Sequence, residues 1–395
     1  MLRGPLRRLA AIAPGALTLA ALACLAAGCP RETAIDLGTP QKVADGVQFY
    51  QVHDPSLLDP AGPVAVQILR LDPSKVDLRP ALAHDRVVQL ETVPGMAERE
   101  HAIAAVNSGF FVLRNGDPTG LLEVRNELVS DAPLARGAVG IIRTPGKPLS
   151  LIFDRVSANV TLRYTIGAEE ITQAIDGVDT TRARGRLMLY TPRYGTSSDM
   201  ADTGAEWQLA GSPLRVVARR PGEGHTPIPR DGVVLSFGGT VLPAGLERLD
   251  NGLEVAIETQ FHPLLDSKPA QWVEATDISG GAGLLVYRGL PMTDWSSEKL
   301  QPRFDTDRHP RTIIGAGRNG TIWLVTVDGR NPAISLGMNF DELKRLALKL
   351  NLYYALNLDG GGSTTMVVNG KIVNHPSDPQ GPRAVSDGLV VAVRR

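Results

Sequence analysis

Residues 357–365 read Asn357-Leu358-Asp359-Gly360-Gly361-Gly362-Ser363-Thr364-Thr365. The run separates two short apolar stretches, 353–358 and 364–368, that have the length and composition of strands. Three consecutive glycines are costly in chain entropy, so we expect a local requirement for bare backbone. Successive N–H groups without side chains can turn toward an anion. The run therefore predicts a phosphate or sugar cradle with Asp359 at its edge, and a hairpin with a wide bulge is the alternative.

The segments on either side of this run predict regular elements. An apolar stripe at spacings of three and four indicates a helix over 338–351, and Asn339 is placed to cap it. Asn-Gly at 369–370 predicts a tight turn into a strand at 371–373, and 388–393 is the last strand. Upstream, 311–316 and 321–327 form a predicted hairpin.

The rest of the chain predicts many short strands and few helices. Its 395 residues include 41 Gly and 29 Pro, spread as turns between strand-like runs. Strands are expected from residue 47 and at 64–71, 102–106, 187–190 and 232–237, and a helix is expected within 90–101. The order of elements predicts an α+β fold, a strand-rich set of mixed sheets with a few helices. We expect an N-terminal strand region, 46–90, packed on a main domain, 91–395.

The N-terminus indicates export. Residues 1–28 carry three arginines and no acid, followed by an uncharged Ala- and Leu-rich stretch, which is typical of a signal peptide. Leu25-Ala26-Ala27-Gly28-Cys29 resembles the bacterial lipobox, so we expect a lipid on Cys29, then a polar tether over 29–45. The predicted location is the cell envelope, on the periplasmic or outer-surface side of a membrane. A retained anchor helix and cleavage without a lipid are the alternatives.

Composition excludes several classes of function. The only cysteines are Cys24 and Cys29, so the mature body has no cysteine nucleophile, disulfide or Cys-ligated zinc. Removing residues 1–28 lowers the net charge from -1 to -4. A body with this charge is not built to bind nucleic acid over a broad surface.

Further polar residues stand at the ends of predicted strands. His309-Pro310-Arg311-Thr312 precedes one strand, and Arg is a natural bidentate partner for phosphate while His exchanges protons near neutrality. Taken alone, a surface Arg and a solvated His are the simpler interpretation. Asn107 follows the strand 102–106, where it could hydrogen-bond a sugar hydroxyl or orient a carboxylate. Asp328-Gly329-Arg330 ends a predicted strand, and the segment with Arg383 to Asp387 precedes the last one, so each places charge at a strand end. By themselves these two motifs indicate turns.

Together and in this order, these motifs resemble the phosphodiester glycosidase family. The resemblance covers roughly residues 90 to 395, and makes 91–395 a catalytic domain of that family. It departs at Ser108, where the family usually has Gly, and at Asp387, where it usually has Asn. The resemblance implies hydrolysis of the sugar–phosphate bond of a glycosyl 1-phosphodiester, with an α-N-acetylglucosaminyl group as one candidate sugar. The expected partner is a sugar 1-phosphodiester or phosphoglycan.

The resemblance also suggests roles for the candidate residues. We expect Asp359 to act at the anomeric centre or on the attacking water, with His309 and Asn107 as its catalytic partners. The predicted substrate- and phosphate-binding residues are Arg311, Thr312, Gly360, Gly361, Gly362, Ser363, Arg383 and Asp328. The sequence indicates no definite cofactor; a divalent cation stays open if the fold gathers Asp328, Asp359 and Asp387.

Two alternatives remain at this stage. One is a non-catalytic lipoprotein that binds envelope glycans or phosphoglycans. The other is a serine hydrolase that uses Ser363 with His309, although Ser363 lacks the nucleophile-elbow pattern.

Overall fold

The computed structural model describes residues 34–198, 200–201 and 204–394. The predicted signal peptide and Cys29 lie outside these residues. Within the described ranges, no helix has the length and apolar character needed to cross a membrane.

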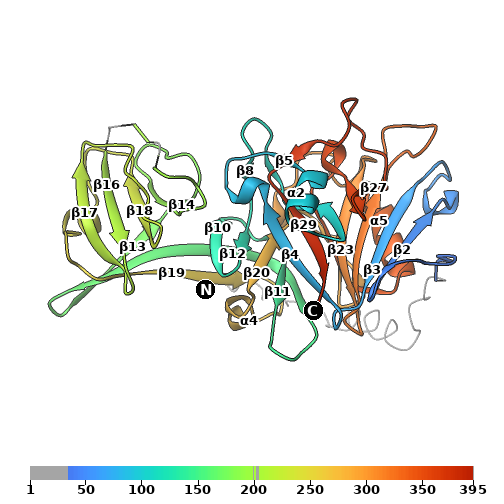
Figure 1. Cartoon of the computed structure of the whole chain (residues 1–395), viewed down its shortest axis with the longest axis horizontal. Helices are drawn as coiled ribbons and strands as arrows, with labels where there is room; N and C mark the ends of the chain where they lie inside the picture. Colours follow the sequence, from blue (N-terminus) through green and yellow to red (C-terminus); the bar gives the residue numbers. More distant parts are fainter. Residues whose placement is uncertain (1–33, 199, 202–203, 395) are drawn as a thin grey trace, which may run out of the picture.

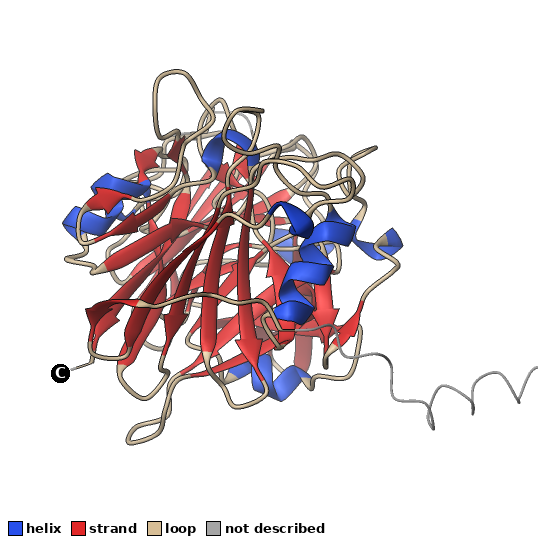
Figure 2. Ribbon diagram, turned by 90° about the vertical axis from the view of Figure 1, so that its right-hand side faces the viewer, coloured by secondary structure: helices blue, strands red, loops and turns tan. Residues whose placement is uncertain are grey.

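The main body has four layers, in which two sheets pack face to face and a helix covers each outer face (Figure 2). The eight-stranded sheet has the order β1-β2-β3-β24-β23-β25-β21-β22. Its strands are β1 Gln41–Ala44, β2 Val47–Val52, β3 Val66–Leu71, β21 Leu284–Tyr287, β22 Leu290–Pro291, β23 Arg311–Gly317, β24 Ile322–Val327 and β25 Leu352–Asn357. The facing five-stranded sheet has the order β27-β26-β6-β29-β4. Its strands are β4 Val76–Leu82, β6 Ala104–Asn107, β26 Met366–Val368, β27 Lys371–Ile372 and β29 Asp387–Val393.

Successive side chains of a strand point to opposite faces of its sheet, so strands of the eight-stranded sheet contribute to two layers of the core. Ile314 of β23 and Leu356 of β25 point into the core between the sheets, whereas their neighbours Ile313 and Ala355 pack under the helix α5 Phe340–Lys349. The helix begins at a capping box in which the Asn339 side chain accepts from the N–H of Glu342 and the Glu342 carboxylate accepts from the N–H of Asn339. On the opposite side of the body, α2 Val93–Arg99 covers the five-stranded sheet.

A long strand carries a second lobe away from this body. The strand β12 Ser150–Ile166 pairs with β11 at its start, with β13 at its end and with β19 between them, so it extends from the body into the lobe at the left of Figure 1. The other strands of its sheet are β9 Leu122–Val124, β10 Glu127–Ser130, β11 Arg136–Ile142, β13 Glu169–Ile175, β19 Val255–Pro263 and β20 Asp277–Gly280.

The lobe is closed by a sheet of order β14-β15-β18-β16-β17 with its own apolar core around Trp207. Its strands are β14 Gly177–Val178, β15 Leu187–Tyr190, β16 Ala205–Ala210, β17 Arg215–Pro221 and β18 Gly232–Phe237. The remaining elements are the helices α3 Ala244–Glu247 and α4 Pro269–Val273, the pair β5 Glu91–Thr92 with β28 Ala384–Val385, and the pair β7 Phe111–Val112 with β8 Asp117–Pro118.

The prediction of a strand-rich α+β fold with few helices is confirmed. The sheet that contains β14 is mixed, because β14 runs parallel to β15 while its other pairs are antiparallel. Strands of the segment 46–90 enter both sheets of the body: β3 pairs with β24, and β4 pairs with β29. The predicted domain boundaries remain predictions.

Candidate functional site

The glycine loop, residues 358–365, is the crossover between the two sheets of the body. It leaves β25 of the eight-stranded sheet and enters β26 of the five-stranded sheet, so it lies at one end of the sandwich. Gly361 to Ser363 form a single 3₁₀ turn that opens with Gly361 at a φ of 61°. This left-handed conformation favours glycine.

Each of the three glycines is in close contact with another part of the chain. A Cβ added at Gly360 would lie 2.6 Å from the carbonyl oxygen of Pro310. At Gly361 it would lie 2.9 Å from Arg330 Nη2, and at Gly362 it would lie 2.1 Å from Arg383 Nη2. Bare backbone is therefore required because two guanidinium groups and a neighbouring strand pack directly on the loop.

Only part of the predicted amide cradle is open to a ligand. The N–H of Gly360 donates to Asp359 Oδ1 at 2.8 Å, and the N–H of Gly361 donates to the Pro310 carbonyl at 2.9 Å. Both groups are therefore engaged within the protein. Positive charge at the loop comes from the arginine side chains rather than from three converging amides.

Asp359 is held in place through its backbone. Its N–H donates to the Ser108 carbonyl at 2.8 Å, and its carbonyl accepts from Asn107 Nδ2 at 2.7 Å. Burial raises the pKa of Asp359 to about 6, and the nearby Asp387 carboxylate adds to this effect. Asp359 is thus ionised at neutral pH yet basic for a carboxylate, which suits a general base or a nucleophile.

Asn107 connects the strand β23 to the glycine loop through hydrogen bonds of its side chain. It is fully buried at the end of β6, where Oδ1 accepts from Thr312 Oγ1 at 2.7 Å and from the N–H of Thr365 at 3.1 Å. Its amide therefore joins β23 to both ends of the glycine loop. Asn107 and Thr312 act as positioning residues in this arrangement, and neither side chain is free for a substrate.

Two arginines flank the loop, and they differ in whether their guanidinium groups are paired with a carboxylate. Asp378 accepts from Arg383 Nε at 2.8 Å and from Nη2 at 3.1 Å, so that guanidinium is fixed and partly neutralised. Arg330 is exposed, and its guanidinium has no hydrogen bond or ion pair with any described residue. The available cation at the loop is therefore Arg330, for which the motif Asp328-Gly329-Arg330 predicted no role.

The expectation that Arg311 contacts phosphate needs correction. Its side chain is only 2% exposed and lies with the rings of Phe304 and Phe340 at 4.9 and 5.0 Å from the guanidinium carbon. It donates to the carbonyls of Phe304 and Met338 at 2.6 and 3.0 Å. The reason is the strand period, which places Arg311 on the same face as Ile313, under α5 and away from the open side of the loop.

His309 lies close to the cationic side of the site without bonding to Ser363. Burial lowers the pKa of His309, and the positive charges of Arg311 and Arg330 add to the effect. The Ser363 hydroxyl is buried next to the Asp359 carboxylate, whose pKa it lowers, and it has no well-formed hydrogen bond with any described residue. The serine hydrolase alternative thus lacks its nucleophile–base pair in this structure.

The three aspartates considered for a cation do not form one cluster. Asp328 accepts from Gln67 Nε2 and from Asn374 Nδ2, whereas Asp387 accepts from the N–H of Gly109 and from the Ser386 hydroxyl. Across the described ranges, no group of three His, Cys, Asp or Glu side chains is placed to hold a metal ion.

Unpartnered polar atoms gather at the glycine loop. Of the seven buried side-chain atoms without a partner in the described part of the chain, four belong to residues 357–365. They are Asn357 Oδ1, Ser363 Oγ, Thr364 Oγ1 and Thr365 Oγ1. Buried polar groups in proteins are nearly always paired, so this concentration indicates that water or a ligand completes the site.

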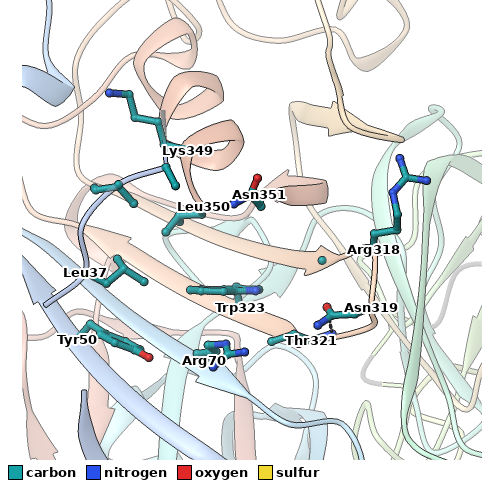
Figure 3. A pocket seen from close by; sticks show the side chains of 13 residues that line it. Leu37, Tyr50, Arg70, Arg318, Asn319, Thr321, Trp323, Lys349, Leu350 and Asn351 are labelled. Carbon is teal, nitrogen blue, oxygen red and sulfur yellow. Dashed lines mark hydrogen bonds between the residues drawn. The ribbon is translucent and has the colours of Figure 1, made fainter. Parts of the chain in front are cut away.

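Two pockets differ in their relation to the loop. A pocket of about 310 Å³ lies beside Arg330 and includes Asp328, His375 and Ser377. A pocket of about 470 Å³, lined by Trp323 and Arg70 among others, lies at the Gly317 end of β23 (Figure 3). The length of that strand separates the second pocket from the glycine loop by roughly 20 Å.

Comparison with known proteins confirms the predicted family resemblance over part of the chain. The family model for phosphodiester glycosidase matches residues 204–392. The Bos taurus N-acetylglucosamine-1-phosphodiester alpha-N-acetylglucosaminidase is 43% identical over 68 residues, which are 17% of this chain and 12% of that protein. A prophage-derived Bacillus subtilis protein is 36% identical over 105 residues, 27% of this chain and 15% of that protein. The chain thus matches only a small share of these relatives' length.

Two solved structures share the fold over most of this chain. A hypothetical protein from Synechocystis has a TM-score of 0.74 and 24% identity, covering 91% of this chain and 64% of its own. A Burkholderia pseudomallei K96243 protein, provisionally described as exported, has a TM-score of 0.69 and 25% identity, covering 84% and 74%.

Proposed function

Because residues 204–392 match the phosphodiester glycosidase family, we propose that this chain hydrolyses the sugar–phosphate bond of a glycosyl 1-phosphodiester. The observation that carries the proposal is that the glycine loop holds the buried carboxylate of Asp359 and is contacted at Gly361 by the Arg330 guanidinium, which has no partner among the described residues. A carboxylate beside a cation fits a substrate that has an anomeric carbon bonded to an anionic phosphate.

The reaction breaks the bond between C1 of the sugar and the bridging oxygen, which departs with the phosphate. Water supplies the new oxygen on C1, and its proton passes to a carboxylate. A phosphate monoester leaves without first gaining a proton, so the site mainly needs to hold the phosphate and to stabilise positive charge at C1. Arg330 serves the first need and Asp359 the second, with Arg383 fixing the loop beneath the phosphate.

The proposed substrate sugar is α-N-acetylglucosamine, in line with the name of the bovine relative. The proposed setting is an exported lipoprotein of the cell envelope, anchored through Cys29, acting on envelope or extracellular glycans. The alternative is a lipoprotein that binds such glycans without cleaving them. The observation favouring catalysis is the buried carboxylate of Asp359 within the glycine loop, where burial raises its pKa to about 6, a value suited to a general base near neutral pH.

The test is hydrolysis of an N-acetylglucosamine 1-phosphodiester by the protein from residue 30 to residue 395, followed by NMR of the released sugar. We expect turnover by the wild type, none by Asp359→Asn, and a fall on the order of 100-fold for Arg330→Ala. Arg248→Ala, at a surface ion pair in the second lobe, is the matched control and should retain full activity. Binding of the diester without release of sugar by the wild type would favour the binding-protein alternative. The anomer released first distinguishes retention from inversion.

A further inference from the structure

The pocket beside Arg330 contains an aspartate–histidine pair that the proposed reaction leaves unused. Asp328 Oδ2 lies 3.3 Å from His375 Nδ1, and Asp328 Oδ1 accepts from the backbone N–H of His375 at 2.9 Å. The Asp328 side chain is 2% exposed, whereas that of His375 is 63% exposed. The buried carboxylate thus fixes one ring nitrogen and leaves Nε2 directed to the open side.

Two further polar groups at this pocket have no partner among the described residues. Ser377 Oγ is buried with no hydrogen-bond partner in the described part of the chain, and the Arg330 guanidinium is free as described above. Among the described residues that line the pocket, the only carboxylate is that of Asp328, whose oxygens are already engaged. A cation, an imidazole and a hydroxyl without a competing free carboxylate are complementary to a phosphoryl group.

Arg330 connects this pocket to the glycine loop. Its guanidinium lies against Gly361, and Arg330 also lines the pocket together with His375. A group bound between Arg330 and His375 is therefore adjacent to the loop that carries Asp359. The volume of about 310 Å³ falls at the lower end for small-molecule sites, with room for a phosphoryl group and the first atoms of its alcohol.

We propose that Arg330, His375 and Ser377 form a subsite for the phosphoryl leaving group and the start of the alcohol esterified to it. The imidazolium of His375 donates from Nε2 to a non-bridging oxygen of the phosphoryl group, while its Nδ1–H stays hydrogen-bonded to the Asp328 carboxylate. Ser377 donates its hydroxyl proton to a second oxygen. This assignment rests on the proposed function for its place in a reaction, but phosphoryl binding itself requires no turnover.

The test is calorimetric titration of the body from residue 30 with inorganic phosphate and with methyl phosphate at low ionic strength. We expect saturable binding by the wild type, weakened at least 10-fold in His375→Phe and several-fold in Ser377→Ala. His375→Gln, which keeps a donor, should recover part of the affinity. His53→Phe, at an exposed histidine elsewhere, is the control and should bind as the wild type.

The outcomes separate this inference from the proposed function. Phosphate binding that depends on His375 in a protein without glycosidase activity would support the subsite and overturn the function. Sugar release that phosphate inhibits equally in wild type and His375→Phe would support the function and overturn the subsite. Absence of phosphate and methyl phosphate binding by the wild type would also overturn the subsite.

Discussion

At the scale of single residues, Asp359 is a group that the proposed reaction needs in its ionised form, although that form destabilises the folded protein. Burial raises its pKa from 3.8 to about 6, so the folded protein binds this proton more tightly than the unfolded chain. The contribution of the group to stability is therefore fully present below pH 3.8 and is lost as the pH rises through about 6. At pH 7 the ionised side chain costs roughly 3 kcal/mol.

This linkage predicts that Asp359→Asn is inactive and more stable than the wild type at pH 7. The amide cannot ionise, so the variant avoids the cost of a buried charge. Thermal unfolding of both proteins between pH 4 and pH 7 measures the effect, and the difference in Tm should shrink toward pH 4. A variant less stable than the wild type at pH 7 would contradict this account. Wild-type activity should also decline as the pH falls below about 6.

The placement of Arg311 and Arg330 could be predicted only in part from the sequence. The motif around Arg311 correctly indicated a segment next to the glycine loop, since Pro310 accepts the N–H of Gly361. The side chain, however, follows the alternation of β23 and turns under α5, which required knowing which face that helix covers. Arg330 sits at a φ of 63° in the turn after β24, a conformation that no local pattern around it indicated.

At the scale of elements, the glycine loop is a contact surface as well as a turn. Gly361 and Gly370 both have positive φ, at 61° and 72°, but only Gly361 has a neighbour within 4 Å of an added Cβ, the Arg330 guanidinium. We predict that Gly361→Ala and Gly370→Ala each lose about 1–2 kcal/mol of stability from the left-handed backbone. Only Gly361→Ala should displace Arg330.

Chemical denaturation and sugar-release assays of the two variants measure this difference. Gly361→Ala should reduce activity at least 10-fold, and Gly370→Ala should leave it unchanged. Equal activity in both variants would show that the contact between Gly361 and Arg330 is not needed.

The sequence predicted elements well where a local pattern was complete. The apolar stripe and Asn339 cap identified α5 within two residues, and Asn-Gly correctly placed the turn between β26 and β27. It did not predict the 17-residue strand β12, because that strand changes partners along its length, with both faces buried in its first half and one face buried in its second half. The His375–Asp328 pair joins residues 47 positions apart and likewise has no local signal.

At the scale of the whole molecule, the proposal of a lipid anchor depends on one of the two cysteines. We predict that Cys29→Ser moves the full-length protein from the membrane fraction to the soluble or secreted fraction of the producing cell. Cys24→Ser is the matched control, because Cys24 lies within the predicted signal peptide. Fractionation and mass spectrometry of the mature N-terminus measure both effects, and membrane retention of Cys29→Ser would contradict the anchor.

The position of the N-terminal segment gives this anchor a direction. Ile35 donates its N–H to the Lys349 carbonyl, and Ala34 and Leu37 line the pocket of Figure 3 at the far end of β23 from Asp359. Ala34 is only five positions after Cys29, a reach of about 17 Å for an extended chain. A lipid on Cys29 would therefore hold the Trp323 end against the headgroups and turn the glycine loop outward. Its substrates would then be polymer chains projecting from the surface rather than lipids of the leaflet in which it is seated.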